Sequence, residues 1–128
     1  MKFFHTALAV KNLEESQNFF EEVFGFHFKV QGERPELGVK FVMVEDENGT
    51  IIEFFEHKSP KHLTEDLMDF QQIGIKHIAF VVDNIDEIMK KALTAGAKVI
   101  WPIKKGVTIK RLAFIADPNG IPIELAEV

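Results

Sequence analysis

Two histidines and two glutamates occupy matching positions in the two halves of the chain. His5 and His77 each lie in a short alternating stretch that predicts a β-strand, and Glu53 and Glu124 each lie within another. The histidines are 72 positions apart and the glutamates 71 apart, so the spacing repeats. Two imidazole nitrogens and two carboxylates form a ligand set for a divalent metal ion (Ni, Zn, Co, Mn or Fe) that leaves positions for water or substrate.

Each of these residues, taken alone, also has an ordinary structural explanation. A single His in a strand is often a hydrogen-bonded core residue, and a single Glu often lies on a solvated face. The segments around Glu53 and Glu124 are nearly continuous apolar runs, however, which predicts burial on both faces. A buried, unpaired carboxylate costs several kcal/mol, and neither strand contains Lys or Arg. A metal ion is therefore the partner that the pattern favours.

The glutamates belong to a longer repeat that organises the whole chain. A turn at residues 46–49 leads into the Glu53 strand, and a similar turn at residues 117–120 leads into the Glu124 strand. Capping residues mark two helix starts and glycines mark two helix ends: Asn12 with Glu15, Asn84 with Glu87, Gly25 and Gly96. Each half therefore reads as strand, helix and three strands.

These signals predict an α+β fold with two tandem β-α-β-β-β modules in one domain, 1–128. The first module covers residues 1–57, a connector covers 58–74, and the second module covers 75–128. Within this plan, residues 31–38 are expected to form an exposed loop and residues 63–70 a short helix. The last two strands of the second module are expected at residues 107–116 and 121–126.

Composition limits the class of protein. A formal net charge of -5 without a basic run argues against a nucleic-acid partner. The absence of cysteine excludes disulfides and thiolate metal sites, so a metal must be bound by His and carboxylate. There is no signal-peptide pattern and no long apolar span, which favours a cytoplasmic protein with no membrane association.

The motifs resemble those of the vicinal oxygen chelate (glyoxalase/bleomycin resistance/dioxygenase) superfamily, and within it those of glyoxalase I, or lactoylglutathione lyase. The resemblance covers essentially the whole chain and rests on four segments: His5-Thr-Ala-Leu-Ala-Val, Phe19-Phe20-Glu-Glu-Val-Phe-Gly25-Phe26, Gly74-Ile-Lys-His77-Ile-Ala-Phe-Val-Val and Asp117-Pro-Asn-Gly120 followed by Glu124. It implies a U-shaped mixed sheet around one metal held by His5, Glu53, His77 and Glu124. It also implies a homodimer, with each metal held within one chain or by modules of two chains.

The same resemblance implies a reaction and leaves alternatives open. A glyoxalase-type lyase or isomerase converts the hemithioacetal of an α-keto aldehyde and a thiol through an enediolate, with Glu124 or Glu53 as the catalytic base. An epimerase or dioxygenase on the same scaffold, or a non-catalytic small-molecule-binding protein of resistance type, is the alternative. The presence of Glu53 favours glyoxalase, because similar epimerases carry Gln there and similar dioxygenases use only one Glu.

The residues say less about which thiol the substrate contains than about the metal ligands. Glutathione-using relatives carry an Arg four residues after the first metal His, and this chain has Ala9 there. Four cations could bind an anionic group instead, although each also fits a solvated surface position: Arg34, Lys104, Lys105 and Arg111. Phe55 and Trp101 are candidates for lining a pocket, or for the core.

Overall fold

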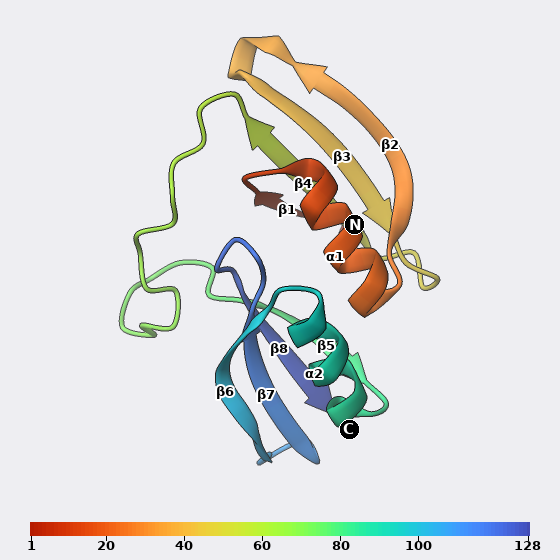
Figure 1. Cartoon of the computed structure of the whole chain (residues 1–128), viewed down its shortest axis with the longest axis vertical. Helices are drawn as coiled ribbons and strands as arrows, with labels where there is room; N and C mark the ends of the chain where they lie inside the picture. Colours follow the sequence, from red (N-terminus) through yellow and green to blue (C-terminus); the bar gives the residue numbers. More distant parts are fainter. The chain divides into compact units, whose positions relative to one another are not determined.

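Strands and helices follow the order β-α-β-β-β twice along the chain (Figure 1). The computed structural model describes all 128 residues, and the chain divides into two units, Met1–His62 (unit 1) and Leu63–Val128 (unit 2). Each unit forms its own four-stranded mixed sheet and carries one α-helix. The predicted α+β class with tandem β-α-β-β-β modules is therefore confirmed.

Unit 1 has strand order β1-β4-β3-β2, in which β1 runs parallel to β4 and the other neighbours are antiparallel. Its elements are β1 (Thr6–Ala9), α1 (Leu13–Phe24), β2 (His27–Arg34), β3 (Val39–Glu45) and β4 (Ile51–His57). A 3₁₀ turn, η1 (Pro35–Leu37), joins β2 to β3.

Unit 2 repeats this arrangement with strand order β5-β8-β7-β6, and β5 runs parallel to β8. Its elements are β5 (Ile78–Val82), α2 (Ile85–Thr94), β6 (Lys98–Lys105), β7 (Arg111–Ala116) and β8 (Pro122–Glu127). In both units the first strand pairs with the last. A His just before the first strand therefore lies beside a Glu in the last strand.

The helices begin where the sequence predicts. The side chains of Asn12 and Asn84 accept hydrogen bonds from the backbone N–H of Glu15 and Glu87, at 2.8 and 3.2 Å. The helix α1 ends at Gly25, whose φ of 73° is the left-handed conformation that glycine adopts without steric cost. The second helix ends one residue before the predicted glycine, at a cap on Ala95.

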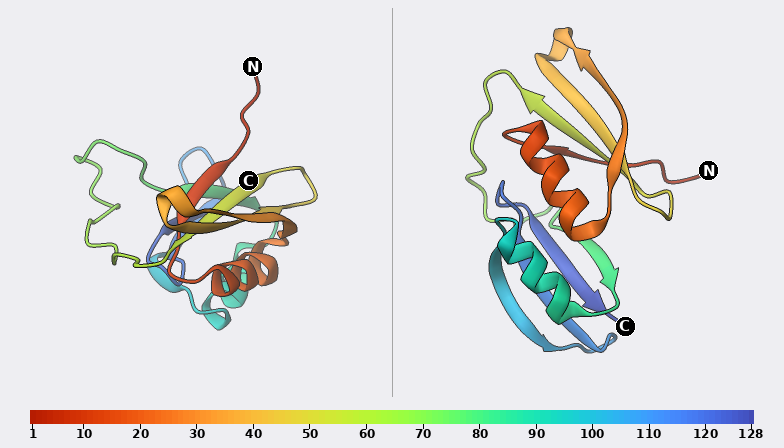
Figure 2. Two further views of the ribbon diagram at one scale, coloured as in Figure 1. Left: turned by 90° about the horizontal axis from the view of Figure 1, so that it is seen from above. Right: turned by 45° about the vertical axis from the view of Figure 1, so that its right-hand side comes forward.

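Each helix packs on one face of its own sheet (Figure 2). In unit 1 the contact is largely aromatic, since the buried ring of Phe20 lies 5.2 Å from that of Phe54 in β4 and 6.0 Å from that of Phe26. In unit 2 the packed residues are mainly aliphatic and fully buried: Ile85, Ala92, Ala113, Ile115, Ile123 and Leu125. This burial of apolar surface is the main stabilising contribution in both units.

Two local expectations are wrong. Residues 31–34 belong to β2 and not to a loop, because they form a continuous antiparallel ladder with residues 39–42 of β3. Residues 63–70 form turns and bends and not a helix. There the side chains of Asp66 and Asp69 accept the backbone N–H of Met68 and Gln71, which closes turns in place of a helical ladder.

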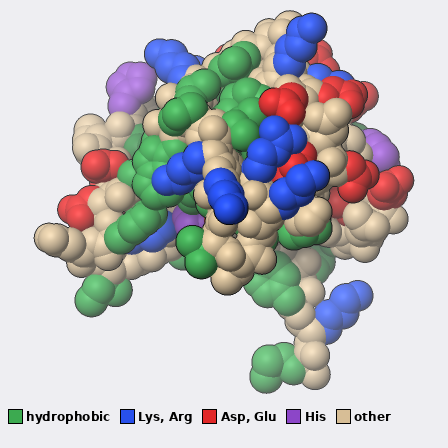
Figure 3. Space-filling view, turned by 90° about the horizontal axis from the view of Figure 1, so that it is seen from below, with side chains coloured by type: hydrophobic (Ala, Val, Ile, Leu, Met, Phe, Trp, Pro, Cys, Tyr) green, Lys and Arg blue, Asp and Glu red, His purple; other side chains and the backbone are tan.

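The third strand of unit 2 is also shorter than predicted, since β7 begins at Arg111 and residues 106–110 form a turn region. Part of the apolar content remains on the surface, including Phe3, Ile73 and Val107, and hydrophobic side chains lie among Lys and Arg side chains on the face shown in Figure 3. Neither helix combines the length and apolar character needed to cross a membrane.

Candidate functional site

His5 and Glu53 meet where β1 and β4 run side by side in unit 1. The parallel register pairs Ala7 with Glu53, and His5 lies just before the first residue of β1. His5 Nε2 lies 3.3 Å from Glu53 Oε1, and the two side chains are 23% and 8% exposed. The prediction that Glu53 is buried is confirmed, and its partner inside the unit is an imidazole.

His77 and Glu124 form the same pair in unit 2. Ala79 of β5 pairs with Glu124 of β8, and His77 lies just before β5. His77 Nε2 lies 3.1 Å from Glu124 Oε2. The Glu124 side chain is 22% exposed, so it is more accessible than its counterpart in unit 1.

Both glutamates lie on the sheet face opposite the helix. Their neighbours in the strand, Ile52 and Phe54 in one unit and Ile123 and Leu125 in the other, are buried in the cores. Alternate residues of a strand point to opposite faces, so each carboxylate points away from its helix. The residue directly across from each glutamate on the parallel neighbouring strand is an exposed alanine, Ala7 in unit 1 and Ala79 in unit 2.

Ring contacts hold the two imidazoles in place. Phe4 meets the His5 ring edge-on with centroids 4.4 Å apart, and Phe114 meets the His77 ring at 5.0 Å. The Nδ1 atom of each histidine is buried and has no hydrogen-bond partner. Packing and the Nε2 contact to Glu therefore set the orientation of both rings.

The geometry of each pair fits two neighbouring ligands of one metal ion. Ligand atoms about 2.1 Å from a metal and at right angles to each other are about 3.0 Å apart, close to the 3.1 and 3.3 Å measured here. One nitrogen and one oxygen per unit also match the donor types that first-row divalent metals accept. No group of three or more His, Asp or Glu side chains converges on one point, so each unit brings together two of the four predicted ligands.

Aromatic side chains extend from the pair in unit 2 across the sheet. Phe114 of β7 is directly opposite Glu124, and Trp101 of β6 is directly opposite Phe114. The Trp101 ring lies 4.6 Å from that of Phe114 and 6.3 Å from that of Phe70. Lys104 Nζ lies over the Trp101 ring, 4.3 Å from its centroid. Trp101, one of the predicted lining residues, therefore lies on the face of the candidate site.

The corresponding face of unit 1 has different side chains. Met43 and Val30 take the ladder positions that Phe114 and Trp101 occupy in unit 2. The next row contains Phe55 and Phe41, whose rings are 6.4 Å apart, so the predicted lining residue Phe55 also lies on the site face. The predicted cation Arg34 lies 5.7 Å from the centroid of Phe41.

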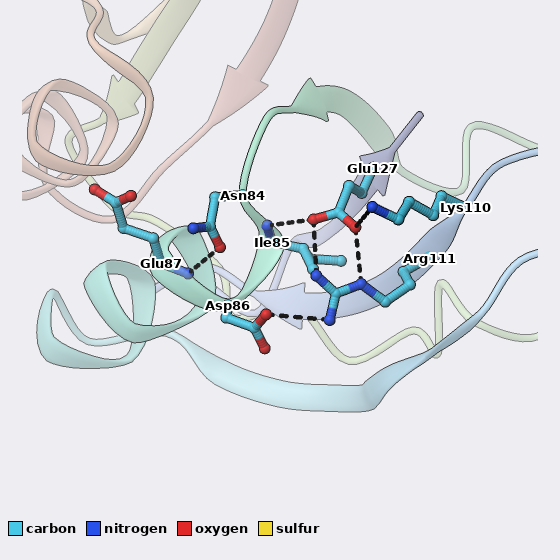
Figure 4. A network of polar contacts seen from close by, with 7 residues as sticks. All are labelled: Asn84, Ile85, Asp86, Glu87, Lys110, Arg111 and Glu127. Atoms are coloured by element: carbon cyan, nitrogen blue, oxygen red, sulfur yellow. Dashed lines mark hydrogen bonds and ion pairs between the residues drawn. The ribbon is translucent and has the colours of Figure 1, made fainter.

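Arg111, another of the predicted anion-binding cations, has internal partners (Figure 4). Its guanidinium donates to both oxygens of Glu127 across the β7–β8 ladder, at 2.8 and 2.9 Å, and lies 3.1 Å from Asp86 of α2. Glu127 also accepts the backbone N–H of Ile85, the first residue of α2. These bonds occupy Arg111 and lock the end of β8 to the start of the helix.

The same contacts shift two pKa values. Hydrogen bonds from Arg111, and then from the Ile85 backbone, lower the pKa of Glu127 to about 2, and the carboxylate raises the pKa of Arg111 further above its already high ordinary value. In unit 1, Glu56 accepts the N–H of Leu13 at 2.9 Å, so the link between the last strand and the helix is repeated without an arginine. Nothing in the sequence indicated this role for Glu56 and Glu127, because the link becomes visible only when the strand pairing is known.

Comparison with known proteins gives consistent results over nearly the whole chain. Residues 2–125 match the family model of the Glyoxalase/Bleomycin resistance protein/Dioxygenase superfamily. A methylmalonyl-CoA epimerase from Dictyostelium discoideum is 34% identical, with the alignment covering 98% of this chain and 78% of the relative. A lactoylglutathione lyase from Escherichia coli O157:H7 is 32% identical, covering 99% and 93%.

Solved structures show the same fold. A glyoxalase family protein from Bacillus cereus aligns with a TM-score of 0.83 at 23% identity, covering 99% of this chain and 93% of that one. The trypanothione-dependent glyoxalase I of Leishmania major aligns with a TM-score of 0.78 at 22% identity, covering 99% and 86%.

Proposed function

Because the chain belongs to the Glyoxalase/Bleomycin resistance protein/Dioxygenase superfamily, we propose that it is a metal-dependent, glyoxalase-type lyase or isomerase of a small molecule with two adjacent oxygens. The observation that carries the proposal is the repeated pair of His Nε2 and Glu carboxylate, 3.3 Å apart in unit 1 and 3.1 Å in unit 2. The relative named lactoylglutathione lyase supports the reaction class. We take the substrate to be the hemithioacetal of an α-keto aldehyde and a thiol.

All four residues are proposed metal ligands, two from each unit: His5, Glu53, His77 and Glu124. The ion is a first-row divalent metal, with Ni, Zn, Co, Mn and Fe as candidates. A metal bound there supplies stabilisation of the negative charge that develops on two adjacent substrate oxygens. Each His ring packs against a phenylalanine ring, and its Nε2 atom points towards the Glu carboxylate. The nitrogen and oxygen donors of each unit are therefore close together before a metal ion binds.

Glu124 is the proposed base. It takes the proton from the carbon that bears sulfur and hydroxyl and returns it to the neighbouring carbonyl carbon, which gives a 2-hydroxyacyl thioester without net gain or loss of atoms. Its side chain is 22% exposed, compared with 8% for Glu53, so a substrate reaches it more easily. We assign Glu53 mainly to metal binding, with the same proton chemistry open to it.

A second candidate function is epimerisation of an acyl thioester. The relative named methylmalonyl-CoA epimerase, at 34% identity, favours it. This reaction uses the same proton abstraction next to a carbonyl but returns the proton to the same carbon from the opposite face, for which two carboxylates are suited. A non-catalytic small-molecule-binding protein needs neither the metal nor a base.

Metal-reconstituted turnover separates these functions. The purified protein is analysed for bound metal, stripped with a chelator, reloaded with each of the five metals in turn and assayed with methylglyoxal hemithioacetals made from several thiols. We expect metal-dependent formation of 2-hydroxyacyl thioester. Racemisation of a chiral 2-methyl acyl thioester without hemithioacetal turnover would favour the epimerase. Absence of bound metal, with no gain on reloading, would favour the binding protein and contradict the proposal.

We also propose that the protein is a homodimer. The edge strands of the two sheets, β1 and β2 in one and β5 and β6 in the other, each leave one side unpaired. Large apolar side chains near these edges are exposed, including Phe3, Phe28 and Val81, and a second copy of the chain can cover them. Light scattering after size-exclusion chromatography should give twice the mass of 14.6 kDa, and a monomeric mass at micromolar concentration would contradict this assignment.

A further inference from the structure

We propose that Asn48, in the turn between β3 and β4, is a site of spontaneous deamidation that leaves an isoaspartyl or aspartyl residue. The equivalent residue of unit 2, Asn119, is protected by the fold. Asn48 and Asn119 are the only two of the five asparagines that precede a glycine. The inference is independent of the proposed function, because neither turn contains a candidate metal ligand.

An asparagine followed by glycine has the covalent arrangement that this reaction needs. The backbone nitrogen of Gly49 attacks Cγ of Asn48, which closes a succinimide ring. The Cγ–Nδ2 bond breaks, and ammonia leaves with the proton of the glycine amide. Water then opens the ring at Cγ to give aspartate, or at the backbone carbonyl to give isoaspartate. Because glycine has no Cβ, no side chain hinders the attacking nitrogen.

The two Asn-Gly turns have the same main-chain hydrogen bonds. In unit 1, the Gly49 amide donates to the carbonyl oxygen of Asp46 at 3.1 Å. The Asp46 carboxylate accepts the amides of Asn48 and Thr50 at 3.0 and 2.8 Å. The corresponding distances at Asp117 in unit 2 are 2.9, 2.9 and 2.8 Å. The difference between the two sites therefore lies in their side chains.

The side chain of Asn119 is held within unit 2. Its Nδ2 donates to Oδ2 of Asp117 at 3.1 Å, and Asp117 is only 4% exposed. The preceding Pro118 restricts the backbone of the turn, and Leu63 Cδ2 lies 3.7 Å from the position that a Cβ on Gly120 would take. The Asn119 amide must therefore break its bond to Asp117 before Cγ can reach the glycine nitrogen.

The side chain of Asn48 is not held in this way. Asn48 is exposed, the residue before it is the exposed Glu47, and its side-chain amide makes no hydrogen bond within the chain. The surroundings of Gly49 are open as well, since the nearest atom to an added Cβ is 4.0 Å away. Cγ of Asn48 can therefore rotate towards the glycine nitrogen, and water can reach the ring that forms.

The isoaspartyl product lengthens a turn that closes a hairpin. Its main chain runs through Cβ and Cγ, which adds a carbon atom between residues 48 and 49. The same turn holds the Asp46 amide 3.0 Å from the carbonyl oxygen of Thr50, next to the paired residues Glu45 and Ile51. We expect the longer chain to break these turn bonds and loosen the start of β4, whereas the aspartyl product keeps the normal main chain.

Peptide mapping of aged protein tests the proposal. The full-length protein is incubated at mildly alkaline pH in heavy-oxygen water and sampled over several weeks. Digestion with trypsin then takes place at mildly acidic pH in ordinary water, so deamidation during digestion stays unlabelled. The two sites lie on different tryptic peptides, 41–58 and 112–128. We expect labelled acid to form about tenfold faster at Asn48 than at Asn119, the factor for a hydrogen bond that must first break.

The same incubation in guanidinium chloride is the control for the fold. Both Asn-Gly sequences are then unfolded, so the two rates should approach each other. Equal rates in the folded protein, or a faster rate at Asn119, overturn the proposal. A ratio that is the same in the folded and unfolded protein assigns the difference to neighbouring residues in the sequence and overturns the protective role of the fold.

Labelling with an isoaspartyl methyltransferase and a radioactive methyl donor detects the rearranged product. Aged Asn48→Ser, which keeps a turn-forming residue without a side-chain amide, should accept far less label than the aged unchanged protein. Asn119→Ser is the matched control and should accept as much label as the unchanged protein. Equal labelling of Asn48→Ser and the unchanged protein contradicts the assignment to Asn48.

The isoaspartyl form, separated by chromatography, shows whether the hairpin is loosened. Asn48→Asp is the reference, because it has the same added charge and a normal main chain. The isoaspartyl form should unfold at a lower urea concentration than Asn48→Asp. Identical unfolding curves contradict the loosened hairpin.

Discussion

The two units contain the same His–Glu pair but differ in the side chains around it. In unit 1, Glu53 is nearly buried and its cross-strand neighbour is Met43. In unit 2, Glu124 is more exposed and its neighbour is Phe114, next to Trp101. Duplication of the strands accounts for the pair, and the differences around it give the two carboxylates different access to a substrate.

The β-bulges of the two sheets are also partly shared and partly specific to one unit. A bulge between Phe28 and Val30 in β2 recurs between Val99 and Trp101 in β6, at the spacing of the repeat. The bulge between Trp101 and Lys104 is present in unit 2 alone. In unit 1 the equivalent part of the ladder is regular, and the ring of Phe41 lies so close over Gly32 that an added Cβ would be 2.7 Å from it. In unit 1 this region therefore contains the Phe41 ring with Arg34 5.7 Å from its centroid, and in unit 2 it contains Lys104 over the Trp101 ring.

The largest expected difference between the units is catalytic. Glu124→Gln should lower kcat by about 10²- to 10⁴-fold, because the variant lacks the proposed base. Glu53→Gln should mainly weaken metal binding, with a smaller effect on kcat at saturating metal. Steady-state kinetics together with metal titration measure both effects.

Glu47→Gln is the control for these variants, since Glu47 is an exposed turn residue, and it should behave like the unchanged protein. Equal losses of kcat in Glu124→Gln and Glu53→Gln, with metal fully bound in both, would show that the units contribute alike to proton transfer.

Core substitutions should destabilise both units, through aromatic packing in unit 1 and aliphatic packing in unit 2. Phe54 is fully buried against Phe20 in unit 1, so Phe54→Ala should lower the free energy of unfolding by about 3–5 kcal/mol. Leu125 is fully buried in unit 2, and Leu125→Ala should cost about 2–5 kcal/mol. Urea unfolding followed by circular dichroism measures both.

Val99→Ala, at a surface position that is 46% exposed, is the control and should change stability by less than about 0.5 kcal/mol. If Phe54→Ala and Val99→Ala were equally mild, the aromatic packing of unit 1 would not be a main source of its stability.

The smallest effect concerns the ion pair that only unit 2 contains. The pKa of Glu127 is lowered to about 2 from an ordinary 4.5, so its contribution to stability is fully present above pH 4.5 and is lost as the pH falls towards 2. Glu127→Gln should therefore be less stable than the unchanged protein at pH 7, and this difference should shrink as the pH falls to about 2. Urea unfolding at several pH values measures it.

Glu56→Gln is the matched variant in unit 1, where the side-chain oxygen still accepts the Leu13 amide and no arginine is lost. It should cost less stability than Glu127→Gln at pH 7. A difference between Glu127→Gln and the unchanged protein that stays constant from pH 7 to pH 2 would rule out the ion pair as its cause.

The sequence predicted the elements that depend on local signals. Asn12 and Asn84 cap the helices as expected, since a cap needs only its own turn, and Gly25 ends α1 for the same reason. The sequence placed each His within the first strand of its unit, whereas His5 and His77 each lie one residue before that strand. Their Nε2 atoms still lie 3.3 and 3.1 Å from the carboxylates of Glu53 and Glu124.

What the sequence could not provide depends on partners distant in the chain. Residues 31–34 are polar and exposed, so they resemble a loop until β3 is known to pair with them. The position of Phe114 opposite Glu124 follows only from the register of β7 on β8. The return of Lys104 to the Trp101 face depends on one extra residue in the ladder, which no alternation pattern reveals.

The carboxylate that receives the first amide of each helix has a consequence for synthesis on the ribosome. Leu13 donates to Glu56, and Ile85 donates to Glu127, so in both units the start of the helix is completed by the strand made last. A nascent unit with its helix and first three strands still lacks that acceptor and one of the two central strands of its sheet. During synthesis, unit 1 should therefore complete its sheet only when β4 emerges from the ribosome, and unit 2 only when β8 emerges.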